Sequence, residues 1–113
     1  MKLIYPAGPI TDTDMTKVFE NVSKLMLCYF RLINEGYAVH CTGADVFGFM
    51  GGLHAPVDSI KASDIAILLR CDAVLCLDGW EASPGCRAEV AAANVAGIPV
   101  YYDMESLLME VKP

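Results

Sequence analysis

The chain has 113 residues, a formal net charge of -6 and 55% hydrophobic residues, and only 19% of its residues are charged. This composition excludes a disordered chain, which needs low hydrophobicity and high charge density. It also argues against a nucleic-acid partner, because acidic residues outnumber basic ones 14 to 8. The length predicts one domain over residues 1–113 with a single core. The apolar excess over a thinly charged surface favours a homo-oligomer, a dimer or larger.

The cysteines and the hydropathy pattern indicate where the protein works. The five cysteines form no C-x-x-C pair, which favours a reducing compartment and thiols that act as small core residues. Neither histidine stands at ligand spacing from a cysteine pair, so we expect no metal and no cofactor. No apolar stretch reaches the roughly 18 residues of a membrane span. We therefore expect a cytoplasmic protein without a membrane partner.

The first half of the chain alternates between short apolar runs and helical periodicity. Residues 2–7 predict a strand, residues 14–35 a helix ended by Gly36, and residues 37–41 a second strand. Residues 42–56 are rich in glycine and have no clear period, so they predict a loop. A loop of this length and composition serves either as a functional lid or as a surface that packs on another subunit.

The second half repeats this alternation. The predicted elements are a helix at 57–70, a doubly buried strand at 73–77, a loop at 78–83, a helix at 84–96, a strand at 98–102 and a helix at 105–111. The order predicts a Rossmann-like or flavodoxin-like α/β domain, with a parallel sheet of four or five strands and helices on both faces. Ligands bind beyond the carboxyl ends of such strands, which here lead into the loops at 8–12, 42–56 and 78–83.

Two of the predicted elements carry candidate site residues in the first two thirds of the chain. Tyr5 stands near the end of the first strand and reads either as a site residue or as a half-buried aromatic. Gly8 offers a place where the backbone can approach a ligand, although the dinucleotide fingerprint is absent. Asp64 shares a helical stripe with Ile60 and Leu68. A carboxylate there is costly unless it is paired or moves a proton, and the alternative is an aspartate at the edge of the stripe that faces solvent.

The N-terminus of the helix predicted at 84–96 could also bind an anion. Ser83 at the N-cap and Pro84 at the first helical position favour this start, and a helix N-terminus attracts negative groups. Glu89 lies in the second turn of an alanine-rich helix that can approach the sheet closely. We expect the helix dipole to keep Glu89 ionised, as a nucleophile requires, while the alternative is a solvated surface glutamate. Trp80 could stack on a flat base or form a subunit contact.

In this combination the residues resemble the nucleoside 2-deoxyribosyltransferase superfamily, and most closely its short phage and bacterial members of undefined substrate. The motifs that carry the resemblance are Tyr5-x-x-Gly8, Asp64 followed by Asp72, Gly79-Trp80-Glu81-x-Ser83-x-Gly85-x-x-x-Glu89, and Gly97-Ile-Pro-Val. They occur in the expected order, and the resemblance spans nearly the whole chain.

The resemblance implies an enzyme that cleaves or exchanges the N-glycosidic bond of a (deoxy)nucleoside or of its 5′-monophosphate. Glu89 then attacks the anomeric carbon and forms a covalent glycosyl intermediate. Asp64 assists protonation of the leaving base, and Tyr5 positions the nucleophile or the sugar. A serine at position 83 is typical of the nucleotide N-glycosidases of this superfamily, where it holds the 5′-phosphate. The expected substrate-binding residues are Gly8, Pro9, Trp80, Ser83 and Gly85.

Two alternatives stay open at this stage. The loop after the first strand carries Asp12 and lacks the arginine usual in the monophosphate hydrolases, so a free nucleoside and a 5′-monophosphate both remain candidate small-molecule substrates. Transfer and hydrolysis differ only in whether a second base or water attacks the intermediate. The alternative function is a non-catalytic nucleotide-binding module on the same fold.

Overall fold

The computed structural model describes the backbone of residues 1–113 and every side chain except those of Phe47, Phe49 and Met50. Over this backbone, four parallel strands form one sheet in the order β2-β1-β3-β4. The strands are β1 (Leu3–Ala7), β2 (Ala38–Val39), β3 (Ala73–Cys76) and β4 (Val100–Tyr101). The flavodoxin-like α/β class expected from the sequence is confirmed.

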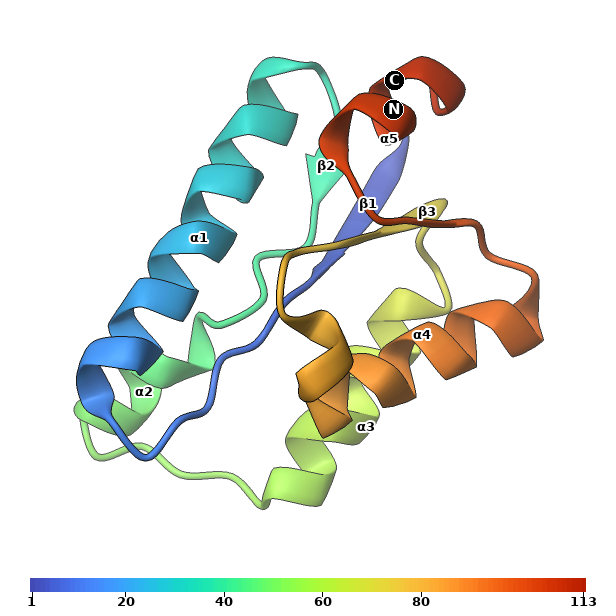
Figure 1. The fold of residues 1–113 in the computed structure, drawn as a ribbon. Coiled ribbons are helices and arrows are strands. Elements are labelled where there is room, and N and C mark those ends of the chain that lie inside the picture. The colour runs from blue at the N-terminus through green and yellow to red at the C-terminus, as the bar shows by residue number, and fades with distance from the viewer.

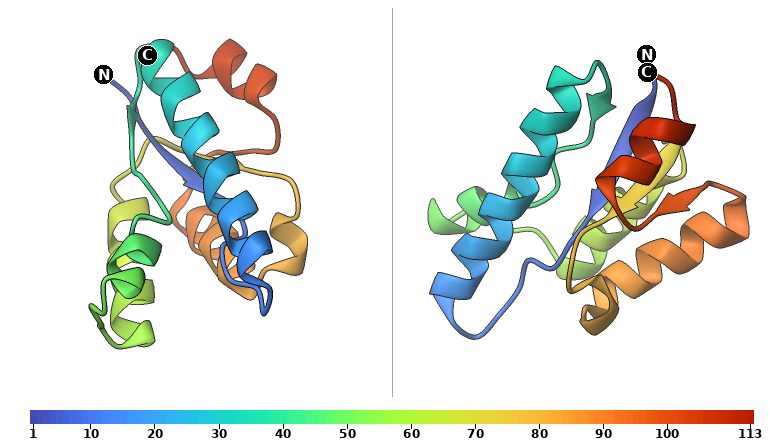
Figure 2. Two further views of the ribbon diagram at one scale, coloured as in Figure 1. Left: turned by 90° about the vertical axis from the view of Figure 1, so that its left-hand side faces the viewer. Right: turned by 45° about the horizontal axis from the view of Figure 1, so that its top comes forward.

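The helices cover both faces of this sheet (Figures 1 and 2). They are α1 (Met15–Asn34), α2 (Asp45–Met50), α3 (Val57–Leu68), α4 (Pro84–Ala96) and α5 (Met104–Glu110), with a short 3-10 turn η1 (Trp80–Ala82) before α4. Two clusters of buried side chains place α1 and α5 against one face and α3 and α4 against the other.

The short helix α2 lies inside the segment that the sequence predicts as a loop. Gly43 has a φ of 89° just before the helix, a left-handed conformation that suits glycine. Val46 is buried among Val18 and Val22 of α1. This tertiary packing stabilises a turn of helix that local periodicity does not indicate.

Alternation along the strands divides the core into two halves. Ile4 and Leu75 point to the α1 face, where they pack with Leu32. Tyr5 and Val74 point to the opposite face and pack beneath α3 and α4. The apolar run of β3 is therefore buried on both faces, as its sequence predicts.

The carboxyl edge of the sheet has a switch point between its two central strands. The chain leaves β1 toward α1 on one face and leaves β3 toward α4 on the other, so the two connections diverge. Gly8 follows β1 at this point and is tightly packed. A Cβ added there would lie 3.2 Å from Cβ of Leu77 and 3.3 Å from Cδ2 of Leu25. Close packing of the loop therefore accounts for this glycine.

Three further findings bear on the expected environment. All five cysteines are free, and four of them are buried, in keeping with thiols that fill the core. In the part of the chain that the structure describes, no helix has the length and apolar character needed to cross a bilayer. Among the described side chains, no group of three or more potential metal ligands comes together.

Candidate active site

Four polar side chains from four different elements meet on the α3–α4 face at the carboxyl edge of the sheet. They are Tyr5 of β1, His40 just after β2, Asp64 of α3 and Glu89 of α4. Three of them were predicted as catalytic from the sequence, and the structure brings those three together. His40 is the residue that sequence reasoning missed.

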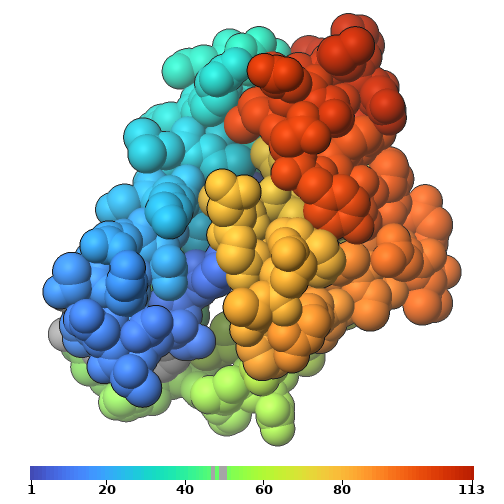
Figure 3. Space-filling view, in the orientation of Figure 1, coloured from blue at the N-terminus to red at the C-terminus, as the bar shows by residue number. Residues whose placement is uncertain are grey.

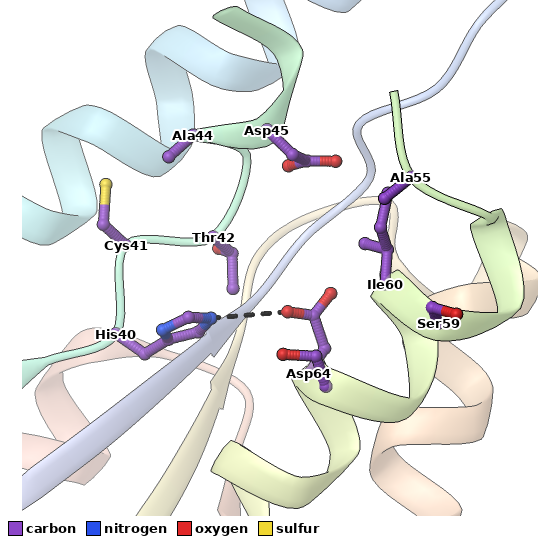
Figure 4. A pocket seen from close by; sticks show the side chains of 10 residues that line it. His40, Cys41, Thr42, Ala44, Asp45, Ala55, Ser59, Ile60 and Asp64 are labelled. Atoms are coloured by element: carbon purple, nitrogen blue, oxygen red, sulfur yellow. Dashed lines mark ion pairs between the residues drawn. The ribbon is translucent and has the colours of Figure 1, made fainter. Parts of the chain in front are cut away.

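His40 is fixed by contacts to both the backbone and the side chains around it. Its backbone N–H donates to the carbonyl of Ile4 at 3.0 Å, which extends the pairing of β2 with β1. Its ring stacks on that of Tyr5, with centroids 5.2 Å apart and planes inclined by 25°. Nε2 of His40 lies 3.5 Å from Oδ1 of Asp64, and the two side chains point toward each other (Figure 4). Asp64 is therefore paired when the imidazole is protonated.

The Tyr5 hydroxyl is enclosed beside Glu89. The side chain of Tyr5 is 0% exposed, and its hydroxyl has no hydrogen-bond partner of regular geometry among the described residues. Burial raises the pKa of this hydroxyl far above its usual value, and the neighbouring Glu89 raises it further through its charge and through hydrogen bonding. Tyr5 thus remains a neutral phenol that can donate to the glutamate.

Burial raises the pKa of Glu89 to about 7, a shift opposite in direction to the one expected from the helix dipole. The hydroxyl of Tyr5 and the charge of His40 lower the pKa, whereas the charge of Asp64 raises it. The dipole acts mainly within the first turn of a helix, and Glu89 lies in the second turn of α4 with its side chain largely covered. Desolvation therefore dominates.

Two adjoining cavities open onto these residues. One, of about 410 Å³, is lined by Glu89, Gly8 and Ser83 among others. The other, of about 380 Å³, is lined by His40 and Asp64 among others. Asp45 and Ile60 line both. In the space-filling view the surface is hollowed where the loop after β1, helix α3 and the start of α4 meet (Figure 3).

The start of α4 supplies hydrogen-bonding groups to the larger cavity. Ser83 caps the helix by accepting from the backbone N–H of Cys86 at 3.3 Å, and it lines the cavity together with Gly85. Lys61 of α3 is the one cationic side chain among the described residues that line this cavity. Sequence reasoning missed Lys61, because only the packing of α3 near α4 brings it to the same cavity as Ser83.

Two predicted substrate-binding residues lie away from both cavities. The ring of Trp80 lies 5.3 Å from that of Tyr102, and Trp80 packs against the core beneath α4. Pro9 lines a small recess between α1 and the end of β3, beside Asp78. The structure therefore brings Gly8, Ser83 and Gly85 to the Glu89 cavity but not these two.

Comparison with known proteins identifies the family. The model of a domain of unknown function, DUF4406, matches residues 2–102. No curated protein matches the chain. The match covers both central strands and all four of the clustered residues. The chain therefore belongs to the DUF4406 family.

Proposed function

We propose that this protein is an enzyme that cleaves or exchanges the N-glycosidic bond of a (deoxy)nucleoside or nucleoside 5′-monophosphate through a covalent glycosyl-Glu89 intermediate. The observation that carries the proposal is the convergence of Tyr5, Asp64 and Glu89 beside two cavities at the switch point of the sheet. Two carboxyl groups of different environment are what a retaining glycosidase needs, one as nucleophile and one as proton donor.

The reaction divides into two displacements at the anomeric carbon. The Glu89 carboxylate forms a bond to that carbon while the bond to the base nitrogen breaks, and the base takes a proton from Asp64. Water then attacks the same carbon, which returns Glu89 to its carboxylate and the proton to Asp64. In an exchange reaction a second base takes the place of water.

The pKa of Glu89 suits this role at neutral pH. A value of about 7 leaves roughly half of the molecules with an ionised Glu89 at pH 7. Positive charge develops on the sugar in the transition state, and a poorly solvated carboxylate stabilises that charge strongly. The enclosed hydroxyl of Tyr5 is placed to hold the carboxylate in orientation.

The cavity lining accommodates a nucleoside and offers groups for a phosphate. Ser83, the first amides of α4 and Lys61 could hold a 5′-phosphate at one end of the larger cavity. Asp45, which lines both cavities, repels a phosphate at their junction and accepts hydrogen bonds from sugar hydroxyls instead. We place the enzyme in the cytoplasm, where such substrates occur and where five free cysteines stay reduced.

The test is a panel of nucleosides and their 5′-monophosphates, with free base measured by chromatography. The wild-type protein is expected to release base from at least one of them, and Glu89→Ala to release none. Glu105→Gln is the matched control, because Glu105 is exposed in the first turn of α5. A second base added to the reaction separates exchange from hydrolysis by its product.

Two results would contradict the proposal. Base release that persists in Glu89→Ala would remove Glu89 from the mechanism. Binding of a nucleotide without turnover, unaffected by Glu89→Ala, would identify the protein as a non-catalytic nucleotide-binding module instead.

A further inference from the structure

His40 is the member of the cluster to which the proposed reaction assigns no task. Its side chain is 23% exposed, it is held against Tyr5 on one side and against Asp64 on the other, and it lines the same cavity as Asp64. Its backbone N–H donates to the carbonyl of Ile4 in β1, which fixes the position of its Cα beside Tyr5. The His40 ring therefore lies next to Asp64, the proposed proton donor, and a part in the proton transfer can be tested.

The surroundings of His40 are acidic. The titratable or charged groups that face it or share its cavity come from β1, α2, α3, α4 and the segment after β2, and they are Tyr5, Asp45, Asp64, Glu89 and Cys41. Three carboxylates and a phenol near one another cannot all ionise readily, because like charges in a poorly solvated site repel. A proton on the imidazole relieves that repulsion.

We propose that His40 is a positioning residue for the proposed cleavage, and that it shares with Asp64 the one proton that Asp64 delivers to the leaving base. The inference rests on the proposed function. The pair holds this proton as imidazolium and carboxylate or as imidazole and carboxylic acid. Glu89 meanwhile stays free to act as the nucleophile. The His40–Asp64 pair thus carries the proton, and Glu89 carries the negative charge.

The steps balance with this single proton. When Glu89 bonds to the anomeric carbon, the electron pair of the glycosidic bond passes to the base nitrogen, which takes the proton from Asp64, and His40 and Asp64 are left as imidazole and carboxylate. When water attacks the intermediate, its oxygen bonds to the anomeric carbon, the bond from that carbon to Glu89 breaks and returns Glu89 to its carboxylate, and one proton of the water returns to the pair. No other reactant is needed.

The test compares two leaving groups on the same sugar. One substrate is the best nucleoside or nucleotide of the panel. The other is the 4-nitrophenyl glycoside of that sugar, whose leaving group departs as 4-nitrophenolate and needs no proton. The variants are His40→Phe, which keeps a ring to stack on Tyr5, and His40→Gln, which keeps a hydrogen-bond donor for Asp64 but does not titrate. His54→Asn is the matched control on the other histidine, which is exposed.

We expect both His40 variants to lower kcat/KM for the nucleoside by about 100-fold or more, the usual share of a general acid, and to leave the 4-nitrophenyl glycoside within about threefold of wild type. The fall of the wild-type nucleoside rate at high pH should also shift in both variants, because that limb reports loss of the delivered proton. His54→Asn should change neither rate.

Three outcomes would overturn the inference. Equal losses on both substrates would mean that His40 only supports the structure. Full nucleoside activity in His40→Gln would mean that a hydrogen bond, and not a shared proton, is what Asp64 needs. A nucleoside pH profile unchanged in both variants would exclude the pair as the proton donor. Failure of the proposed function looks different, because the wild-type protein would then release no base from any substrate.

Discussion

The two fully buried tyrosines of this protein lie on opposite faces of the same sheet, and their hydroxyls differ in hydrogen bonding. Tyr37, on the α1 face, donates its hydroxyl to the carbonyl of Val111. Tyr5, on the α3–α4 face, has an enclosed hydroxyl without a regular partner and with Glu89 beside it. One face gives its tyrosine hydroxyl a regular hydrogen bond to the backbone, whereas the other holds the hydroxyl beside Glu89 without a hydrogen bond of regular geometry.

The two faces of the sheet also differ in the kind of side chain that they bury. The α1 face gathers aliphatic side chains such as Leu32 and Leu107, and its described buried groups are apolar apart from that satisfied tyrosine. The opposite face carries the coupled titratable groups at its carboxyl edge. A protein leaves buried polar groups imperfectly satisfied mainly where function requires it. The α3–α4 face is accordingly the one to perturb when activity is measured.

The largest expected effect on stability comes from a substitution on the α1 face. Leu32 is 0% exposed in the middle of the α1 cluster, so Leu32→Ala should lower the free energy of unfolding by about 2–5 kcal/mol, because it leaves a cavity. Urea denaturation measures this loss. Under the proposed function, the rate of base release per folded molecule should stay at the wild-type value, and a lower rate would show that the two faces are coupled.

The next effect comes from the titration of Glu89. Its pKa in the folded state is about 7 against an ordinary value of 4.5 for a glutamate, so the folded state binds the proton more tightly. The stability from the protonated group is complete below the unfolded pKa and is lost as the pH rises through the folded one. Glu89→Gln should therefore be about 3 kcal/mol more stable than wild type at pH 8 and within about 1 kcal/mol of it at pH 5. Equal differences at both pH values would contradict the raised pKa.

The smallest effect tests the two tyrosines directly. Tyr37→Phe leaves the carbonyl of Val111 unpaired and should cost about 1–2 kcal/mol. Tyr5→Phe removes a hydroxyl that has no regular partner, so at pH 5 the stability should be unchanged or up to about 1 kcal/mol higher. Thermal denaturation of both variants measures the contrast, and similar losses in the two would show that Tyr5 is satisfied in solution.

The sequence predicts best those features that local chemistry decides. The bounds of α4, Pro84–Ala96, are those expected, because Ser83 caps the start, proline stands at the first position and Gly97 ends the helix with a φ of 74°. The β2 strand, expected at 37–41, is reduced to Ala38–Val39, the two residues that stand in register with Leu3 and Ile4 of β1. Pairing of strands depends on distant partners, which local propensity does not reveal.

The site was predictable in part for the same reason. Glu89 and Asp64 could be found from their positions on helices, but His40 required the strand order. Only because β2 lies beside β1 does the residue after β2 stack on Tyr5. The position of a histidine at the carboxyl end of a predicted parallel strand was the signal that could have indicated it. The direction of the Glu89 pKa shift depends on burial, which only the folded chain shows.

The position of Trp80, the only tryptophan of the chain, gives the protein a built-in fluorescent reporter. Trp80 lies partly buried against Tyr102 and the core of the α3–α4 face, so its emission is sensitive to the packing of that face. Circular dichroism, in contrast, is dominated by helical residues, of which α1 contributes the largest share. When the two signals are followed through the same denaturant titration, coincident curves indicate that the two halves of this core unfold as one cooperative unit.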